Sequence, residues 1–273
     1  MNLHTLLLTK NDCYKRGQYI TPIGIVVHST GANNPNLKRY VGPDDGLLGY
    51  NSNNNHWNMS GVGACVNAFI GKLKDGTVAT YQTLPWNMRP WGCASGKKGS
   101  YNNSHIQFEI CEDGLNDRAY FDKVYTEAVQ LCIYLIKKYP TIKVENIVCH
   151  HEAYRLGYGS NHIDVEHWFP RHNKTMDDFR NDVRKGLNKE DKPTTPTVPS
   201  KPTKGVLYKI TADGLRIRKG AGTYYKSVGT VKKNVIYTIV ETRRENGNTW
   251  GRLKSGAGWI CLKYGTKSYA KKV

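Results

Sequence analysis

The sequence predicts two folded bodies: an α/β N-terminal domain with a mixed central sheet and flanking helices, and a small all-β barrel at the C-terminus. Apolar patterns of strand and helix type alternate over residues 1–188, whereas short β-rich runs between glycine turns fill residues 205–273. A proline-rich stretch separates them. The length of 273 residues also exceeds the usual size of a single domain. We therefore expect domains at residues 1–188 and 205–273, joined by a linker at residues 189–204.

Strands are expected in the first domain where short apolar runs occur. These runs are residues 23–27, 66–70, 77–81, 106–110 and 147–149. The second and third runs are typical of a hairpin, because the turn sequence Lys74-Asp75-Gly76 lies between them.

Two helices are expected to accompany these strands. Apolar residues recur at helical spacing from Arg118 to Tyr139, and Pro140 ends the pattern. A second helix follows Thr175, since Asp178 three residues later resembles a capping box.

Proline at every third position, from Pro193 to Pro202, favours a polyproline II linker about 30 Å long. Beyond it, β-rich runs at residues 207–210, 235–240 and 258–262 alternate with turn sequences, and no helical pattern is evident.

Charge is unevenly distributed along the chain. The formal net charge is +18, and residues 191–273 contain 18 Lys and Arg against 4 Asp and Glu. Such an excess predicts an anionic partner, either nucleic acid, acidic lipid or an anionic cell-wall polymer.

The seven cysteines are odd in number and form no CxxC pair, which favours reduced buried thiols over a disulfide framework. Residues 1–10 lack the pattern of a secretory signal, and no run of about 18 apolar residues occurs. We therefore expect no membrane span and synthesis in the cytoplasm.

Histidines follow two of the predicted strands. His28 comes after Ile25-Val26-Val27, and His150 comes after residues 147–149. Strand ends in an α/β sheet line the ligand crevice, so these imidazoles can share one metal ion. His162 and Asp164 stand two residues apart in a loop and offer a third ligand. Two histidines and a carboxylate, with one position open to water, are typical of a hydrolytic zinc site, although packed core histidines produce the same pattern.

Four motifs in this order resemble the type-2 N-acetylmuramoyl-L-alanine amidases, which have the peptidoglycan-recognition-protein fold. The motifs are Val26-Val27-His28-Ser29-Thr30, Ile106-Gln107-Phe108-Glu109-Ile110, Val148-Cys149-His150 and Asp164. The resemblance implies zinc ligands at His28, His150 and Asp164, a catalytic carboxylate at Glu109, and a transition-state-stabilising imidazole at His162. Residues 161–170 are especially similar to phage endolysins of Gram-positive bacteria.

Two positions depart from the family pattern, and a pair of adjacent histidines offers two possible ligands. Members of this family often have His where this chain has Gly92, after Trp91, and at the hairpin position of Asn67. His151 stands beside His150; we expect His150 to be the ligand, because it matches the motif position, whereas His151 would face the opposite side if the strand continued. Neither Gly92 nor Asn67 belongs to the implied zinc set.

Glu109 lies on the strand face opposite Ile106, Phe108 and Ile110, so it can point into a cleft and transfer a proton. Aromatic residues in loops either contact sugar and peptide around that cleft or only cap the sheet. They are Trp57, Trp86, Trp91 and Tyr101.

The second domain resembles a bacterial SH3-like cell-wall-binding domain, from Gly214-Leu215-Arg216-Ile217-Arg218 and Gly258-Trp259-Ile260. The resemblance implies recognition of peptidoglycan, and the basic surface suits teichoic acid. Residues expected to bind the wall are Arg216, Arg218, Trp250 and Trp259. Nucleic acid is disfavoured, because no basic helix or stacking platform accompanies the charge.

These observations predict a zinc-dependent peptidoglycan amidase, an endolysin held in the host cytoplasm until release to the cell wall. Alternatives are a non-catalytic peptidoglycan-recognition protein of the same fold, and a host autolysin with the same activity. A wall peptidase with Cys93 or Cys149 as nucleophile is a further alternative, but no signature surrounds either thiol.

Overall fold

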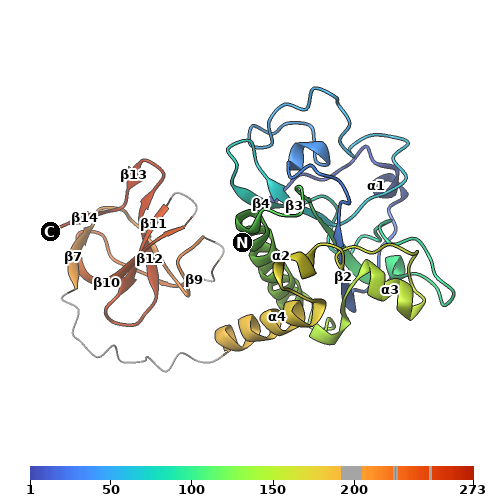
Figure 1. Cartoon of the computed structure of the whole chain (residues 1–273). Helices are drawn as coiled ribbons and strands as arrows, with labels where there is room; N and C mark the ends of the chain where they lie inside the picture. The colour runs from blue at the N-terminus through green and yellow to red at the C-terminus, as the bar shows by residue number, and fades with distance from the viewer. Residues whose placement is uncertain (192–204, 224, 226, 246–247) are drawn as a thin grey trace. The chain divides into compact units, whose positions relative to one another are not determined.

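The computed structural model describes residues 1–191, 205–223, 225, 227–245 and 248–273. The chain forms two compact units, residues 1–193 and 194–273 (Figure 1). Residues 192–204 of the expected linker lie outside the described residues, so its polyproline II conformation stays a prediction. Residues 189–191 are helical rather than part of a linker, because the last helix of the first unit continues to Asp191.

The first unit is built on a mixed six-stranded sheet with the order β1-β4-β3-β5-β2-β6. Its strands are β1 (Leu3–Thr5), β2 (Gly24–Ser29), β3 (Ala68–Lys72), β4 (Val78–Gln82), β5 (His105–Ile110) and β6 (Ile147–Cys149). The hairpin pair β3 and β4 is antiparallel, and the other neighbours are parallel. The predicted mixed α/β architecture is therefore confirmed.

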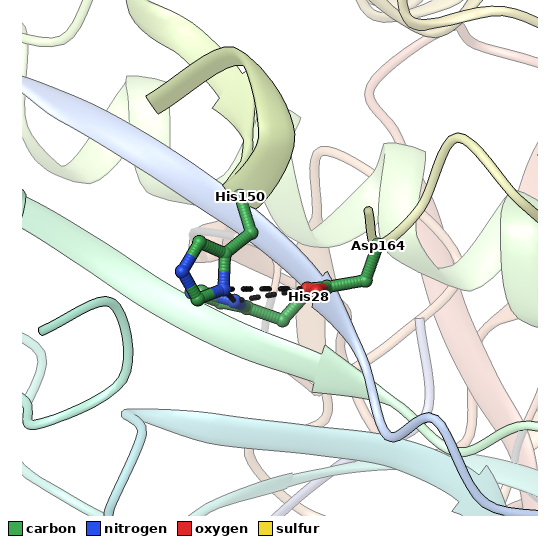
Figure 2. Close-up of side chains that lie close together, drawn as sticks. All are labelled: His28, His150 and Asp164. Carbon is green, nitrogen blue, oxygen red and sulfur yellow. Dashed lines mark hydrogen bonds and ion pairs between the residues drawn. The ribbon is translucent and has the colours of Figure 1, made fainter. Parts of the chain in front are cut away.

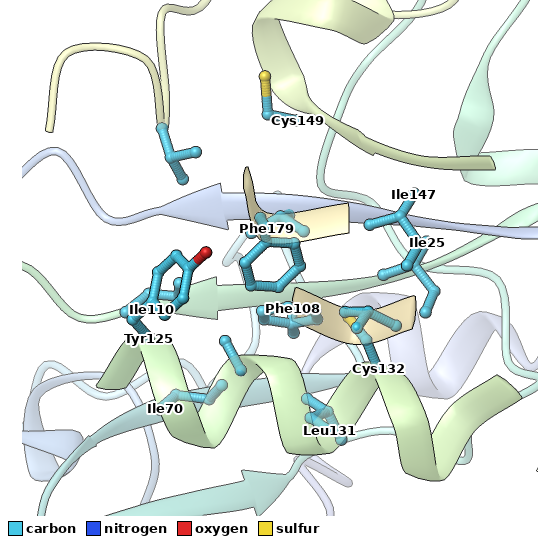
Figure 3. Packing of buried hydrophobic residues seen from close by; sticks show 14 of the residues in the cluster. Ile25, Ile70, Phe108, Ile110, Tyr125, Leu131, Cys132, Ile147, Cys149 and Phe179 are labelled. Atoms are coloured by element: carbon cyan, nitrogen blue, oxygen red, sulfur yellow. The ribbon is translucent and has the colours of Figure 1, made fainter. Parts of the chain in front are cut away.

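Helices α2 (Arg118–Lys138) and α4 (Met176–Asp191) pack with one face of this sheet. Strand residues at alternate positions, such as Ile25, Phe108 and Ile110, meet the apolar face of α2 in one buried cluster (Figure 3). Because side chains alternate across a strand, the residues between them emerge on the opposite face.

The opposite face of the sheet holds the polar residues of β2 and β5. Short helices and long loops cover it, including α1 (Asp12–Arg16) and α3 (His150–Leu156). A second apolar cluster, which includes Phe69 and Tyr81, fills the space under the loops over β3 and β4. The part of this face over β2, β5 and β6 is left for the candidate site.

The second unit contains an eight-stranded sheet with the order β14-β7-β10-β11-β12-β8-β9, and β13 pairs with β12. The strands are β7 (Val206–Ile210), β8 (Arg216–Arg218), β9 (Ser227–Thr230), β10 (Ile236–Glu245), β11 (Asn248–Leu253), β12 (Trp259–Tyr264), β13 (Lys267–Ser268) and β14 (Ala270–Lys272). All its pairings are antiparallel. The unit is all-β in its described residues, as predicted; its closure as an SH3-like barrel stays a prediction.

All seven cysteines are free and buried, as the odd count and the spacing predict. No helix among the described residues combines the length and the apolar character needed to cross a membrane.

Candidate active site

Three side chains from distant parts of the first unit meet at one point. His28 Nδ1 lies 3.1 Å from His150 Nδ1 and 3.2 Å from Asp164 Oδ2. His150 Nδ1 lies 3.6 Å from the same Asp164 oxygen. Figure 2 shows the two rings and the carboxylate converging on each other. This is the one group of three or more His, Cys, Asp or Glu found to suit a metal ion among the described residues.

The topology explains why these residues meet. The parallel strands β5, β2 and β6 are neighbours, and their carboxyl ends lie at one edge of the sheet. His28 is near the end of β2 and pairs in register with Glu109 of β5, while His150 directly follows β6. The expected crevice at the strand ends is therefore present.

The chain turns from strand to helix at His150. Cys149 is the N-cap of α3, where it forms a capping box with Glu152. His151 consequently follows the geometry of a helix rather than of a strand, and it turns aside to hydrogen-bond Glu166 at 2.6 Å. His150 is thus the histidine of this pair that meets His28, as the motif position predicts, but a helix and not a continued strand turns His151 away.

The remaining ring nitrogens of the two histidines are engaged elsewhere. His28 Nε2 lies 2.9 Å from Gln107 Oε1, and His150 Nε2 lies 3.2 Å from Ser160 Oγ. Both Nδ1 atoms are therefore directed at the shared point. A metal-bound histidine commonly has its second nitrogen held by such a hydrogen bond.

The donor set fits zinc. Zinc–nitrogen and zinc–oxygen bonds of tetrahedral sites place neighbouring ligand atoms about 3.3 Å apart. The three measured separations, 3.1, 3.2 and 3.6 Å, bracket this value. Two imidazoles and one carboxylate also leave a fourth position for water or substrate.

Two carboxylates near this point differ in their electrostatics. Burial opposes ionisation of Asp164, but the imidazoles of His28 and His150 beside it hold its pKa well below the usual range. Burial raises the pKa of Glu109 well above its usual range, and the neighbouring carboxylates of Asp164 and Glu112 raise it further. The Oε2 atom of Glu109 is buried and, among the described residues, has no hydrogen-bond partner. A cation at the shared point would stabilise both carboxylates.

A cleft of about 660 Å³ opens above these residues. His150, Asp164 and Glu109 line it, whereas His28 lies behind it and is only 1% exposed. His162 is exposed at the rim, with its ring centroid 4.6 Å from that of His150. Its Nδ1 lies 3.0 Å from Ser160 Oγ, so one hydroxyl connects both rings.

The known family that matches this chain is described as N-acetylmuramoyl-L-alanine amidase, and the match covers residues 18–170, more than half of the chain. The chain belongs to this amidase family. All the side chains at the shared point, together with Glu109 and His162, lie inside the matched region. Membership supports amidase activity on peptidoglycan.

Several solved structures are similar to this amidase. The Staphylococcus aureus hydrolase AmiA, in complex with its ligand, is 18% identical, with a TM-score of 0.48 over 69% of this chain and 83% of that one. A mutant endolysin from Bacillus subtilis is 20% identical, with a TM-score of 0.47 over 67% of this chain and 99% of that one. PlyL is 19% identical, with a TM-score of 0.46 over 67% of this chain and 96% of that one. No curated protein sequence matches significantly.

The four predicted aromatic residues divide between the cleft and other places. Trp57 and Trp91 line the cleft of the first unit. Trp86 does not; it is buried in the main core, where its ring meets Tyr134 of α2. Tyr101 faces a neighbouring pocket and stacks on His105, with the two ring centroids 3.8 Å apart. Of the two alternatives, Trp86 and Tyr101 therefore do not line this cleft, and substrate contact by Trp57 and Trp91 stays a prediction.

The two positions that depart from the family pattern both contact β5. Asn67 exchanges two hydrogen bonds with the backbone of Gln107, at 2.8 and 2.9 Å. A Cβ at Gly92 would lie 2.2 Å from Gln107 Oε1, so a larger residue there would displace this side-chain oxygen. Asn67 thus holds the backbone of β5, and Gly92 leaves room for the side chain of Gln107.

Sequence reasoning missed several residues of this site. Gln107 shares a strand face with Glu109, which is a signal that could have indicated it. His167 also lines the cleft, with Nε2 2.9 Å from Glu112 Oε1, and it lies within the endolysin-like segment. Ser160 and Asn102 carry no such signal, because loops bring them to the cleft.

The alternative of a cysteine nucleophile is not supported. Burial raises the pKa of the Cys149 thiol to about 12 and raises the pKa of Cys93 as well. The Cys93 thiol contacts Asn102, Gln107 and Ser100, none of which can act as the general base of a thiol peptidase.

In the second unit, a cleft of about 420 Å³ brings together three of the four predicted wall-binding residues: Arg216, Arg218 and Trp250. The buried indole N–H of Trp250 has no hydrogen-bond partner among the described residues. Trp259 does not line this cleft; it packs in the adjacent core, and Arg243 lies over its ring at 5.1 Å.

Proposed function

We propose that this amidase is an endolysin that hydrolyses the amide bond between N-acetylmuramic acid and L-alanine of peptidoglycan, using zinc held by His28, His150 and Asp164. The observation that carries the proposal is the convergence of two imidazoles and a carboxylate at the floor of a cleft that Glu109 also lines. A protein that only recognised peptidoglycan would need neither the open ligand position nor the buried carboxylate.

The reaction divides between the metal and the side chains. When bound, zinc would act as a Lewis acid and lower the pKa of a water molecule toward 7. Glu109, which lines the cleft, accepts the proton of the attacking water and returns it to the leaving nitrogen of L-alanine. The carbon–nitrogen bond breaks, leaving a carboxylate on the lactyl group of the sugar and a free amine on the peptide.

His162 stabilises the oxyanion that forms on the attacked carbonyl. It stands at the rim of the cleft against the His150 ring, and its Nε2 is free of the hydrogen bond that engages Nδ1. A donor aimed at the developing charge lowers the barrier by several kcal/mol. Trp57 and Trp91 offer flat surfaces for sugar and peptide beside it.

We further propose that the second unit targets the enzyme to the cell wall. Its cleft combines the guanidinium groups of Arg216 and Arg218 with Trp250, which suits the carboxylate groups of a peptide. The excess of Lys and Arg in residues 191–273 suits the phosphates of teichoic acid.

Analysis of digested cell walls tests the proposed reaction. Mass spectrometry is expected to find free L-alanine amino ends with intact glycan strands. Removing metal with a chelator should abolish lysis, and adding zinc should restore it. Full activity after zinc removal, cleavage of the glycan, or inactivation by thiol alkylation of the zinc-loaded enzyme would refute the proposal.

A further inference from the structure

A chain of hydrogen bonds runs from a loop backbone to the ring of His28. Gln107 is fully buried on β5, with Oε1 2.9 Å from His28 Nε2. Its Nε2 lies 2.9 Å from Asn102 Oδ1. Asn102 follows Tyr101 in a short 3-10 turn, and its Oδ1 also meets the backbone nitrogens of Gly92 and Cys93 at 3.2 and 3.1 Å.

The backbone fixes the direction of every hydrogen bond in this chain. A backbone N–H can only donate, so the Asn102 atom that faces Gly92 and Cys93 must be the carbonyl oxygen. The Gln107 atom that faces this oxygen must then be the amide nitrogen. The other end of the Gln107 amide, which faces His28, is therefore an oxygen that only accepts.

Only one neutral form of His28 satisfies this arrangement. Nε2 must bear the proton that Gln107 Oε1 accepts, so Nδ1 presents its lone pair. The competing form, with the proton on Nδ1, would donate to Asp164 Oδ2 at 3.2 Å and would block the ligand atom. Asp164 favours the ring proton on Nδ1 of His28, whereas Gln107 favours it on Nε2.

The surroundings leave the Gln107 amide little freedom. Asn67 holds the backbone of Gln107 from both sides, and its own amide donates to the carbonyls of Pro85 and Met88 at 3.0 Å each. Gly92 leaves the space that Oε1 occupies, because a Cβ there would lie 2.2 Å from this atom.

We propose that Gln107 is a positioning residue that, oriented by Asn102, keeps the proton of His28 on Nε2 and frees Nδ1 for the metal. The inference rests on the proposed zinc-dependent function, and it assigns to Gln107 and Asn102 a role within that site. Neither residue touches the substrate bond in this role; both act through His28.

Two measurements on the full chain test the proposal. Long-range proton–nitrogen NMR on metal-free protein is expected to show His28 protonated on Nε2. Competition with a chromophoric chelator measures zinc affinity. Gln107→Leu should shift the His28 proton toward Nδ1 and weaken zinc binding about 10- to 100-fold. Gly92→Ala should do the same by displacing Oε1, without removing the amide.

Matched variants separate this role from a general loss of stability. Asn102→Asp keeps an acceptor for Gly92, Cys93 and Gln107, so it should retain the His28 proton on Nε2 and bind zinc at least as tightly as the wild type. Asn102→Leu removes the acceptor and should behave like Gln107→Leu. Thr80→Val removes another buried polar contact, to Glu127 at 2.9 Å, and should leave both readouts unchanged.

The outcomes distinguish this inference from the proposed function. A wild-type His28 protonated on Nδ1 overturns it, and so does a folded Gln107→Leu protein with wild-type tautomer and zinc affinity. If Gln107→Leu does not fold, Gly92→Ala and Asn102→Leu decide in the same way. A wild type that keeps the proton on Nε2 but binds no zinc would support the inference and refute the proposed metal.

Discussion

At the scale of single residues, alternation along β5 separates packing from chemistry. Ile106, Phe108 and Ile110 enter the main core, whereas Gln107 and Glu109 emerge on the face that carries the cleft. A buried polar side chain on this face carries a large desolvation cost unless it has a partner. Gln107 is fully buried and has partners in His28 and Asn102. Glu109 is half-buried and lines the cleft, so it is the residue of this strand face that can meet a ligand there.

The two carboxylates of the site should respond differently to substitution. Glu109→Gln keeps the three metal ligands and is expected to retain about one equivalent of zinc while losing 10²- to 10⁴-fold in turnover. Asp164→Ala removes a ligand and is expected to lose the metal. Metal analysis and wall-lysis rates of both variants provide the check, and the reverse pattern would mean that the two roles are exchanged.

We expect folding stability to depend on pH through His105, a buried histidine outside the candidate active site. Burial lowers the pKa of His105 from 6.5 to about 4. The unfolded chain therefore binds this proton at a higher pH than the folded chain. Folding stability should fall as pH decreases from about 6.5 to about 4, by roughly 3 kcal/mol from this group.

His105→Gln removes the titrating group and should flatten that part of the stability profile. Denaturant unfolding at a series of pH values, together with an NMR titration of His105, tests this. An NMR pKa near 6.5 in the folded protein would contradict the assignment.

At the scale of elements, α4 holds the start of α3 in place. Arg180 of α4 donates to both carboxylate oxygens of Glu152, at 2.9 and 3.0 Å, and to the carbonyl of Ile147 in β6. Glu152 in turn accepts from the backbone of Cys149, which is the N-cap of α3. The turn that presents His150 is thus connected to a helix on the other side of the sheet.

Arg180→Ala should therefore affect both stability and the metal site. Loss of a partly buried bidentate pair is expected to cost about 3 kcal/mol and to weaken zinc binding, since the α3 cap loosens. Calorimetry of the full chain and chelator competition measure the two effects. Arg184→Ala on the same helix is a matched control, because Arg184 pairs with Glu145 at an exposed site and should cost less than about 1 kcal/mol. Equal effects of the two variants would contradict this account.

At the scale of the whole molecule, the two units differ in charge and in chemistry. Residues 1–190 contain 22 Lys and Arg against 18 Asp and Glu, so the excess charge is concentrated in the rest of the chain. The cleft with the candidate active site lies in the first unit, and the cleft with two arginines lies in the second. Tethering such units raises the concentration of the enzyme at its substrate without changing the chemistry.

This division predicts separable activities. Residues 1–191 alone should hydrolyse soluble muropeptide about as fast as the full chain, but should act more weakly on intact walls. Residues 205–273 alone should bind walls without lysing them. Pull-down with walls that contain or lack teichoic acid, at low and high salt, measures the second fragment's binding.

The salt response identifies the ligand of the second unit. Binding that weakens with salt and with removal of teichoic acid supports an electrostatic contribution. Binding that is insensitive to both leaves the peptide as ligand, and binding confined to the first fragment refutes targeting.

Local information in the sequence sufficed for most of the architecture. Helical spacing in α2, alternation in β5 and the turn between β3 and β4 are properties of contiguous residues, so they predict these elements directly. The position of His28 and His150 after apolar runs indicated the edge of the sheet where ligand atoms meet. β1 was missed, because three residues in parallel pairing with β4 carry no periodicity.

Other features depend on contacts between segments far apart in the chain. Trp86 and Trp91 look alike in sequence, yet packing buries the first in the core and places the second in the cleft. The link from Asn102 through Gln107 to His28 requires the register of β5 against β2. Such contacts arise only when strands pair and loops close over them, because their energies depend on distances that no local pattern encodes.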